Sequence, residues 1–138
     1  MKKKIVYVGL CADILHEGHI KILKKASKYG KVIVGLLTDS AIMQYKQKSL
    51  LKYKSRKIVV ENLIFVDKVI PQKTLSYKKN LNELKPDFVV HGDDWKKGIQ
   101  KNVRKEVLLC LKKWNGKLIE PKYTKGISSS LIKIKIAS

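Results

Sequence analysis

Acidic residues and arginine are scarce in this chain of 138 residues. There are 11 Asp and Glu against 31 Lys and Arg, a formal net charge of +20, and the only arginines are Arg56 and Arg104. A dedicated nucleic-acid binder usually clusters arginine, whose planar fork makes two hydrogen bonds to one phosphate. Here lysines are spread over nearly every segment, which favours a solvated basic surface that attracts anionic substrates. Nucleic-acid binding stays the alternative, and its steep weakening with salt would reveal it.

Cysteine and long apolar runs are also scarce. Cys11 and Cys110 are far apart and fit no metal-ligand spacing, which predicts reduced thiols. The N-terminal apolar run, Ile5 to Gly9, is shorter than the hydrophobic region of a signal peptide and far shorter than a membrane span. We therefore expect a cytoplasmic protein without a membrane span. Length and composition predict one compact domain over residues 1–138.

Short apolar runs alternate with helical patterns along the chain. Strands are predicted at Lys4–Gly9, Val32–Leu37, Phe65–Ile70 (ended by Pro71), Asp87–His91 and Lys117–Glu120. Helices are predicted from Gly18 to Gly30, as a short helix after Thr38 and Asp39, over Leu75–Leu84 and over Ser128–Ile136. Another begins near Lys54 and carries Ile58, Val59, Asn62 and Leu63. A longer one follows Gly98 and runs to about Trp114, with Val103, Val107, Leu108 and Leu111 on its apolar face. This order predicts an α/β fold, a Rossmann-like doubly wound parallel sheet of about five strands flanked by helices. Ligands of such sheets bind at the carboxyl ends of the strands.

The sharpest motif is His16-Glu17-Gly18-His19, between the first predicted strand and helix. Two imidazoles three residues apart lie on one side of a helix start, where free amides and the helix dipole favour an anion such as a polyphosphate. Zinc fits less well, because the spacing is not i, i+4 and no third ligand is evident. The simplest alternative is two surface histidines in a loop.

Three further segments carry polar chemistry. Gly92-Asp93-Asp94-Trp95 follows a predicted strand, and its carboxylates could hold Mg²⁺, accept from the amine of a base, or cap a helix. The stretch 126–130, Gly-Ile-Ser-Ser-Ser, offers donors to phosphate or caps an ordinary helix. The rarity of arginine suggests a planar, bidentate contact of Arg56 with a nucleotide, the alternative being an ion pair on a helix surface.

The chain resembles the cytidylyltransferase-like nucleotidyltransferases, whose HxGH signature is matched at positions 16–19. The resemblance continues in ordered blocks at Lys46, Tyr53-Lys54-Ser55-Arg56-Lys57, Val66-Asp67-Lys68-Val69-Ile70-Pro71, His91-Gly92-Asp93-Asp94-Trp95 and Gly126-Ile127-Ser128-Ser129-Ser130. It implies a nucleotidyltransferase fold of the HUP type, with CTP as a substrate, Mg²⁺ as cofactor, and a homodimer. It also implies residue roles. Catalytic residues would be His16, His19 and Lys46. Asp13 and Tyr123 would contact the acceptor, and Asp13 is also a candidate Mg²⁺ ligand. Contacts with the nucleotide would come from Gly9, Leu10, Gly18, Arg56, His91, Gly92, Asp94, Trp95, Thr124, Gly126, Ile127, Ser128 and Ser129.

The acceptor substrate is predicted from positions at which this sequence differs from one branch of that family. The glycerol 3-phosphate branch usually reads RTEGIST near its end, whereas Tyr123 stands here at the position of the arginine, with Lys125 two residues later. The blocks are more similar to the phosphonate branch, whose members accompany phosphoenolpyruvate mutase. We therefore expect CMP transfer from CTP to 2-aminoethylphosphonate or a similar phosphonate, with any mutase on a separate chain. Glycerol 3-phosphate or another phosphomonoester is the alternative acceptor.

Overall fold

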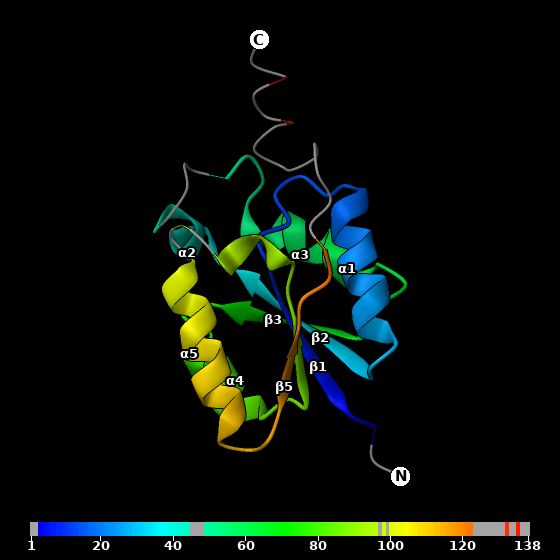
Figure 1. The fold of residues 1–138 in the computed structure, drawn as a ribbon. Coiled ribbons are helices and arrows are strands. Elements are labelled where there is room, and N and C mark those ends of the chain that lie inside the picture. The colour runs from blue at the N-terminus through cyan, green and yellow to red at the C-terminus, as the bar shows by residue number, and fades with distance from the viewer. Residues whose placement is uncertain are drawn as a thin grey trace.

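A five-stranded parallel sheet forms the centre of the computed structural model, which describes residues 3–44, 49–96, 98, 100–122, 132 and 135. The strands are β1 (Ile5–Leu10), β2 (Lys31–Leu37), β3 (Lys68–Gln72), β4 (Phe88–Val90) and β5 (Lys117–Ile119). Their order is β3-β2-β1-β4-β5, and every neighbouring pair is parallel (Figure 1). The predicted α/β class and parallel sheet are confirmed.

Helices cover both faces of the sheet (Figure 1). They are α1 (Glu17–Ser27), α2 (Asp39–Met43), α3 (Tyr53–Glu61), α4 (Lys78–Leu84) and α5 (Lys101–Lys112), with a 3₁₀ turn η1 at Asp93–Lys96. Successive strand residues face opposite sides. Val6 and Val8 of β1 therefore pack with Leu23 of α1, whereas Tyr7 packs with Leu81 of α4 and Val107 of α5. No helix in the described part of the chain is long and apolar enough to cross a bilayer.

Helix and strand boundaries differ from the sequence prediction at one edge of the sheet. The third strand was expected to end before Pro71, but β3 includes that residue. Because β3 is an edge strand paired only with β2, the missing N–H of Pro71 need not break the ladder. The short helix after Thr38 is confirmed, and the Thr38 hydroxyl accepts from the Ala41 N–H at 3.3 Å.

The apolar faces of two helices also differ from the prediction. In α3, Ile58 and Val59 are 53% and 47% exposed, while Arg56 and Val60 are buried. In α5 the predicted face included Leu108, which is 40% exposed, and Cys110 is buried instead. The predicted helix 128–136 lies outside the described residues, except for positions 132 and 135.

Two glycines make room for aromatic rings on one face of the sheet. Gly9 and Gly35 are register partners in β1 and β2. A Cβ on Gly35 would lie 1.7 Å from the Tyr7 hydroxyl oxygen, and one on Gly9 would lie 2.2 Å from that of Tyr77. The Tyr7 hydroxyl donates to Gln72 Oε1 at 2.5 Å and burial raises its pKa, so this ring has a fixed partner. The glycines are thus required by packing.

We expect Gly35→Ala to lower the free energy of unfolding by at least about 1–3 kcal/mol, because the new methyl group overlaps the fully buried Tyr7 ring. Urea unfolding measures the change. Lys31→Ala, an exposed position on the same strand, is the control and should stay within about 0.5 kcal/mol of the parent. Equal stability of the two variants would contradict this packing.

Candidate active site

The segments that follow β1 and β4 meet at the carboxyl edge of the sheet. From the central strand β1, the chain continues to β2 and β3 on one side of β1, and then to β4 and β5 on its other side. The strand order thus reverses between β1 and β4, which is the topological switch point. A Cβ on Gly92, after β4, would lie 4.0 Å from Ile22 Cδ1 of α1, so the two segments adjoin. The predicted ligand-binding edge therefore brings the His16 motif close to the segment that starts at His91.

The two motif histidines form a reciprocal cap at the start of α1. His16 is the N-cap residue, and its Nδ1 accepts from the Gly18 N–H at 3.0 Å. The His19 Nδ1 in turn accepts from the His16 N–H at 3.2 Å. Two of the backbone donors at the helix start are thereby satisfied, as in a capping box. The ring centroids lie 4.1 Å apart, so the two rings pack against each other.

These hydrogen bonds determine which tautomer each ring adopts. Since both Nδ1 atoms accept from backbone N–H groups, the neutral rings carry their protons on Nε2. Burial lowers the pKa of His16, which further favours its neutral form. Each ring therefore presents an Nε2–H donor beside the positive end of the α1 dipole. This arrangement suits the oxygens of a phosphate group.

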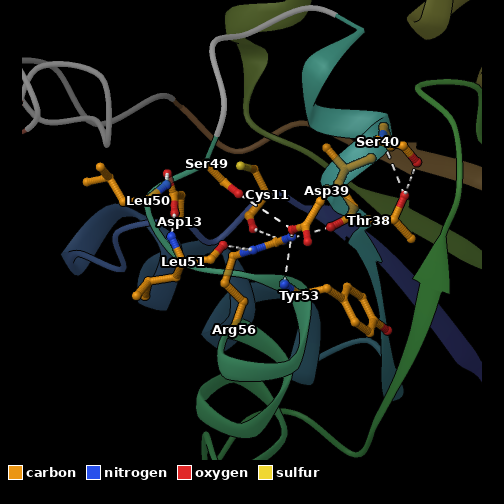
Figure 2. Close-up of polar contacts among 12 residues, drawn as sticks. Cys11, Asp13, Thr38, Asp39, Ser40, Ser49, Leu50, Leu51, Tyr53 and Arg56 are labelled. Carbon is orange, nitrogen blue, oxygen red and sulfur yellow. Dashed lines mark hydrogen bonds and ion pairs between the residues drawn. The ribbon is translucent and has the colours of Figure 1, made fainter.

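Asp13 has a structural role that the sequence did not indicate. Its side chain is buried, and its two carboxylate oxygens accept from the N–H groups of Leu50 and Leu51, each at 2.9 Å (Figure 2). The predicted acceptor contact and Mg²⁺ ligation would require these same oxygens. Each carboxylate oxygen keeps a second lone pair, so both predicted roles stay predictions beside the role observed: Asp13 fixes the chain that leads into α3.

Arg56 is buried at the same edge, with an exposed fraction of 1%. Its Nε donates to the Leu51 carbonyl at 3.0 Å, and its Nη2 donates to Asp39 Oδ1 at 2.7 Å. Its Nη1 donates to the carbonyls of Cys11 and Leu37, at 2.9 and 2.7 Å (Figure 2). One guanidinium thus joins the ends of β1 and β2 to the start of α3. The predicted bidentate contact with a nucleotide is replaced by contacts within the protein, and the alternative of a surface ion pair fails because the group is buried.

The segment after β4 places one predicted ligand at the surface and another in the core. The Asp94 side chain is 49% exposed and lies 3.9 Å from His91 Nδ1. Trp95 is only 2% exposed, and its ring stacks on His91 with centroids 3.7 Å apart and planes 6° apart. A nucleotide can therefore reach Asp94 directly. We revise the predicted direct contact of Trp95 with the nucleotide, because the indole is buried and packs against His91.

His91 is oriented differently from the motif histidines. Its Nδ1 lies 2.7 Å from the Gly92 carbonyl, so this nitrogen donates and carries the proton of the neutral ring. Burial lowers the pKa of His91, although the Gly92 carbonyl and the Asp94 carboxylate oppose that shift. His91 therefore carries its proton on Nδ1 and donates it to a carbonyl of the protein, whereas the neutral rings of His16 and His19 carry theirs on Nε2.

Glu120 and Arg104 were missed by sequence reasoning. Arg104 of α5 makes two hydrogen bonds to the Glu120 carboxylate, both at 2.9 Å, and these bonds lower the pKa of Glu120. The same carboxylate accepts from Trp95 Nε1 at 2.7 Å. A carboxylate directly after the last strand, together with the only other arginine besides Arg56, was the available signal.

Three of the predicted nucleotide-binding residues have other contacts in the structure, and several further predicted site residues lie outside the described residues. The Leu10 side chain lies in the core, the Gly18 amide caps His16, and Gly9 faces Tyr77. The residues beyond the described ranges are Lys46, Tyr123, Thr124, Gly126, Ile127, Ser128 and Ser129.

The described residues do not by themselves form a metal centre. Among residues 3–44, 49–96, 98, 100–122, 132 and 135, no three His, Cys, Asp or Glu side chains are grouped so that they could hold a metal ion. Asp13, the predicted ligand, uses both oxygens on backbone amides. Because Mg²⁺ is usually held by one or two carboxylates together with substrate phosphates, the predicted Mg²⁺ stays a prediction.

An α/β sheet with paired imidazole groups at its switch point is typical of an enzyme that binds a nucleotide. The chain belongs to the cytidylyltransferase-like family, whose model matches residues 6–135. The predicted family is thereby confirmed, and with it the prediction of a nucleotidyltransferase.

Individual relatives carry several names. The chain is 36% identical over 140 residues to a glycerol-3-phosphate cytidylyltransferase of Bacillus spizizenii, covering 100% of this chain and 99% of the relative. It is 33% identical over 131 residues to the bifunctional protein HldE of Campylobacter concisus, covering 91% of this chain but 26% of that protein. A crystal structure of a lipopolysaccharide core biosynthesis protein from Thermoplasma volcanium superposes with a TM-score of 0.74 at 26% identity, over 89% of this chain and all of that one (100%).

Proposed function

We propose that the enzyme transfers CMP from CTP to glycerol 3-phosphate and releases pyrophosphate. The reciprocal histidine cap at the start of α1 is the observation that carries this proposal, since it puts the proton of each neutral ring on Nε2 at a helix start, where the dipole favours an anion. The relative in Bacillus spizizenii and one in Bacillus subtilis are both named glycerol-3-phosphate cytidylyltransferase. The Bacillus subtilis protein is 39% identical over 97 residues, which cover 69% of this chain and 74% of that protein. These relatives favour glycerol 3-phosphate over the phosphonate expected from sequence.

The proposed reaction is an in-line displacement at phosphorus. A phosphate oxygen of glycerol 3-phosphate attacks the α-phosphorus of CTP, and a new P–O bond forms as the bond to the bridging oxygen breaks. Pyrophosphate leaves with that oxygen. The attacking oxygen is already anionic, so no strong general base is needed and catalysis rests on positioning and charge stabilisation.

The residues of this chain would act mainly as hydrogen-bond donors. His16 and His19 would donate their Nε2–H groups to oxygens of the α-phosphate, where negative charge builds up in the transition state. Asp94, half exposed beside His91, would contact the nucleoside. Lys46 and the serines at 128 and 129 are assigned to the leaving pyrophosphate by the family resemblance.

A phosphonate such as 2-aminoethylphosphonate is the second candidate acceptor. Tyr123 favours it, because this residue stands where the glycerol 3-phosphate branch has arginine. The chemistry at the α-phosphorus would be the same, since a phosphonate oxygen is also anionic. The acceptor would then be distinguished by its tail.

Pyrophosphate release with CTP and Mg²⁺ tests the acceptor directly. We expect turnover with glycerol 3-phosphate to exceed that with 2-aminoethylphosphonate or phosphocholine by at least about tenfold in kcat/KM, the effect of about one hydrogen bond. Release with the phosphonate alone would replace the proposed acceptor and restore the one predicted from sequence. ATP and GTP are the controls for nucleotide choice.

A further inference from the structure

The Glu120 carboxylate connects α5 to the indole of Trp95. Its Oε2 accepts from Trp95 Nε1 at 2.7 Å and from Arg104 Nε at 2.9 Å, while its Oε1 accepts from Arg104 Nη2 at 2.9 Å. The side chains of Glu120 and Arg104 are 14% and 27% exposed, so the pair is partly shielded from water. Charge-assisted, bidentate pairs of this kind hold both partners in one orientation.

The indole held by Glu120 in turn supports His91. Trp95 contacts Tyr77, whose ring centroid is 5.8 Å away, and His91, which stacks on it at 3.7 Å. The backbone fixes the same region, because the His91 N–H donates to the Ile119 carbonyl at 3.1 Å. A displacement of the indole would therefore be transmitted to the His91 ring.

We propose that Glu120 is a positioning residue for nucleotide binding: it holds Trp95, and through Trp95 it orients His91 and the turn that carries Asp94. This inference rests on the proposed function, which places CTP beside that turn. Glu120 contacts no substrate in this proposal. Its removal should weaken CTP binding in the ground state and the transition state alike, which raises KM and leaves kcat nearly unchanged.

Two substitutions separate the acceptor role of Glu120 from its charge. Glu120→Leu leaves the buried Trp95 Nε1 without an acceptor, so we expect the KM for CTP to rise about tenfold with kcat within about threefold. Glu120→Gln keeps an acceptor for the indole but loses the charge-assisted pair with Arg104, so the KM should rise only about threefold. Glu61→Gln is the matched control, because that carboxylate makes an exposed ion pair with Lys57 on α3 and should change neither constant.

Tryptophan fluorescence gives a readout that does not depend on turnover. The chain has two tryptophans, and Trp114 donates to the Pro86 carbonyl beyond the far end of α5. In a Trp114→Phe background the emission reports Trp95 alone. We expect Glu120→Leu to shift that emission to longer wavelength and to weaken CTP binding, measured by titration, about tenfold.

The outcomes distinguish this proposal from the function on which it rests. If the parent enzyme neither binds nor uses CTP, the proposed function fails. If the parent uses CTP while Glu120→Leu keeps its KM and its Trp95 emission, the positioning role of Glu120 is wrong. A fall in kcat at constant KM would also overturn it. If Glu120→Leu does not fold, Glu120→Gln decides: we then expect a KM raised severalfold, and an unchanged KM contradicts the proposal.

Discussion

His16→Asn should lose at least about 100-fold in kcat while the protein stays folded and nearly as stable as the parent. Asparagine is among the best N-cap residues, and its side-chain oxygen can replace His16 Nδ1 as acceptor of the Gly18 N–H. It has no atom at the position of Nε2, so the donor to the α-phosphate is lost. Single-turnover CTP cleavage measures the rate, and thermal unfolding measures the stability.

His16→Ala is the matched comparison, because it removes the cap and the donor together. It should show the same loss of rate and a further loss of about 1 kcal/mol in unfolding free energy. If the asparagine variant retained the parent rate, His16 would serve only as a helix cap and the catalytic assignment would be wrong.

The cap also predicts how stability depends on pH. Burial lowers the pKa of His16 below the ordinary 6.5, so the unfolded chain binds the proton more readily than the folded one. The parent should therefore lose stability as pH falls below 6.5. His16→Asn should show a weaker dependence over that range. Equal slopes for the two proteins would mean that His16 is not held neutral by the fold.

Arg56→Met should lower the free energy of unfolding by about 3 kcal/mol, because it leaves buried carbonyls and Asp39 without their donor. Arg56→Lys keeps the charge but cannot reach four acceptors in a fixed plane, so we expect an intermediate loss. Urea unfolding measures both.

Lys57→Met, on the same helix, is the control for Arg56. Its ion pair with Glu61 spans 3.3 Å between half-exposed side chains, and its loss should cost less than about 1 kcal/mol. If Arg56→Met were as stable as the parent but lost CTP affinity, Arg56 would be the nucleotide ligand that the sequence suggested, and the buried network would be unimportant.

The sequence predicted secondary structure well where the pattern within one segment determines whether it forms a strand or a helix. Continuous apolar runs such as Val32–Leu37 predict buried parallel strands, and the intervening helical patterns predict the crossovers between them. The motif at 16–19 could be placed at a helix start because its neighbours on both sides are regular. Pro71 misled the prediction, because only the completed sheet shows that β3 lies at its edge.

The sequence was uninformative where distant segments converge. Arg56 meets carbonyls at the ends of two strands, and those partners are carbonyl groups that every residue has. Glu120 lies 25 residues after Trp95 and 16 after Arg104, so no spacing in the sequence indicates their contact. The tautomers of the histidines likewise depend on backbone geometry that a motif does not encode.

Phosphorus NMR of the enzyme with CTP, Mg²⁺ and glycerol 3-phosphate tests nucleotidyl transfer most directly. We expect the three CTP signals to give way to pyrophosphate and to the paired signals of a diphosphate diester, and His16→Asn to leave CTP almost unchanged over the same time. An unchanged CTP spectrum with the parent enzyme, or equal conversion by the His16→Asn variant, would contradict the proposed transfer from the histidine cap.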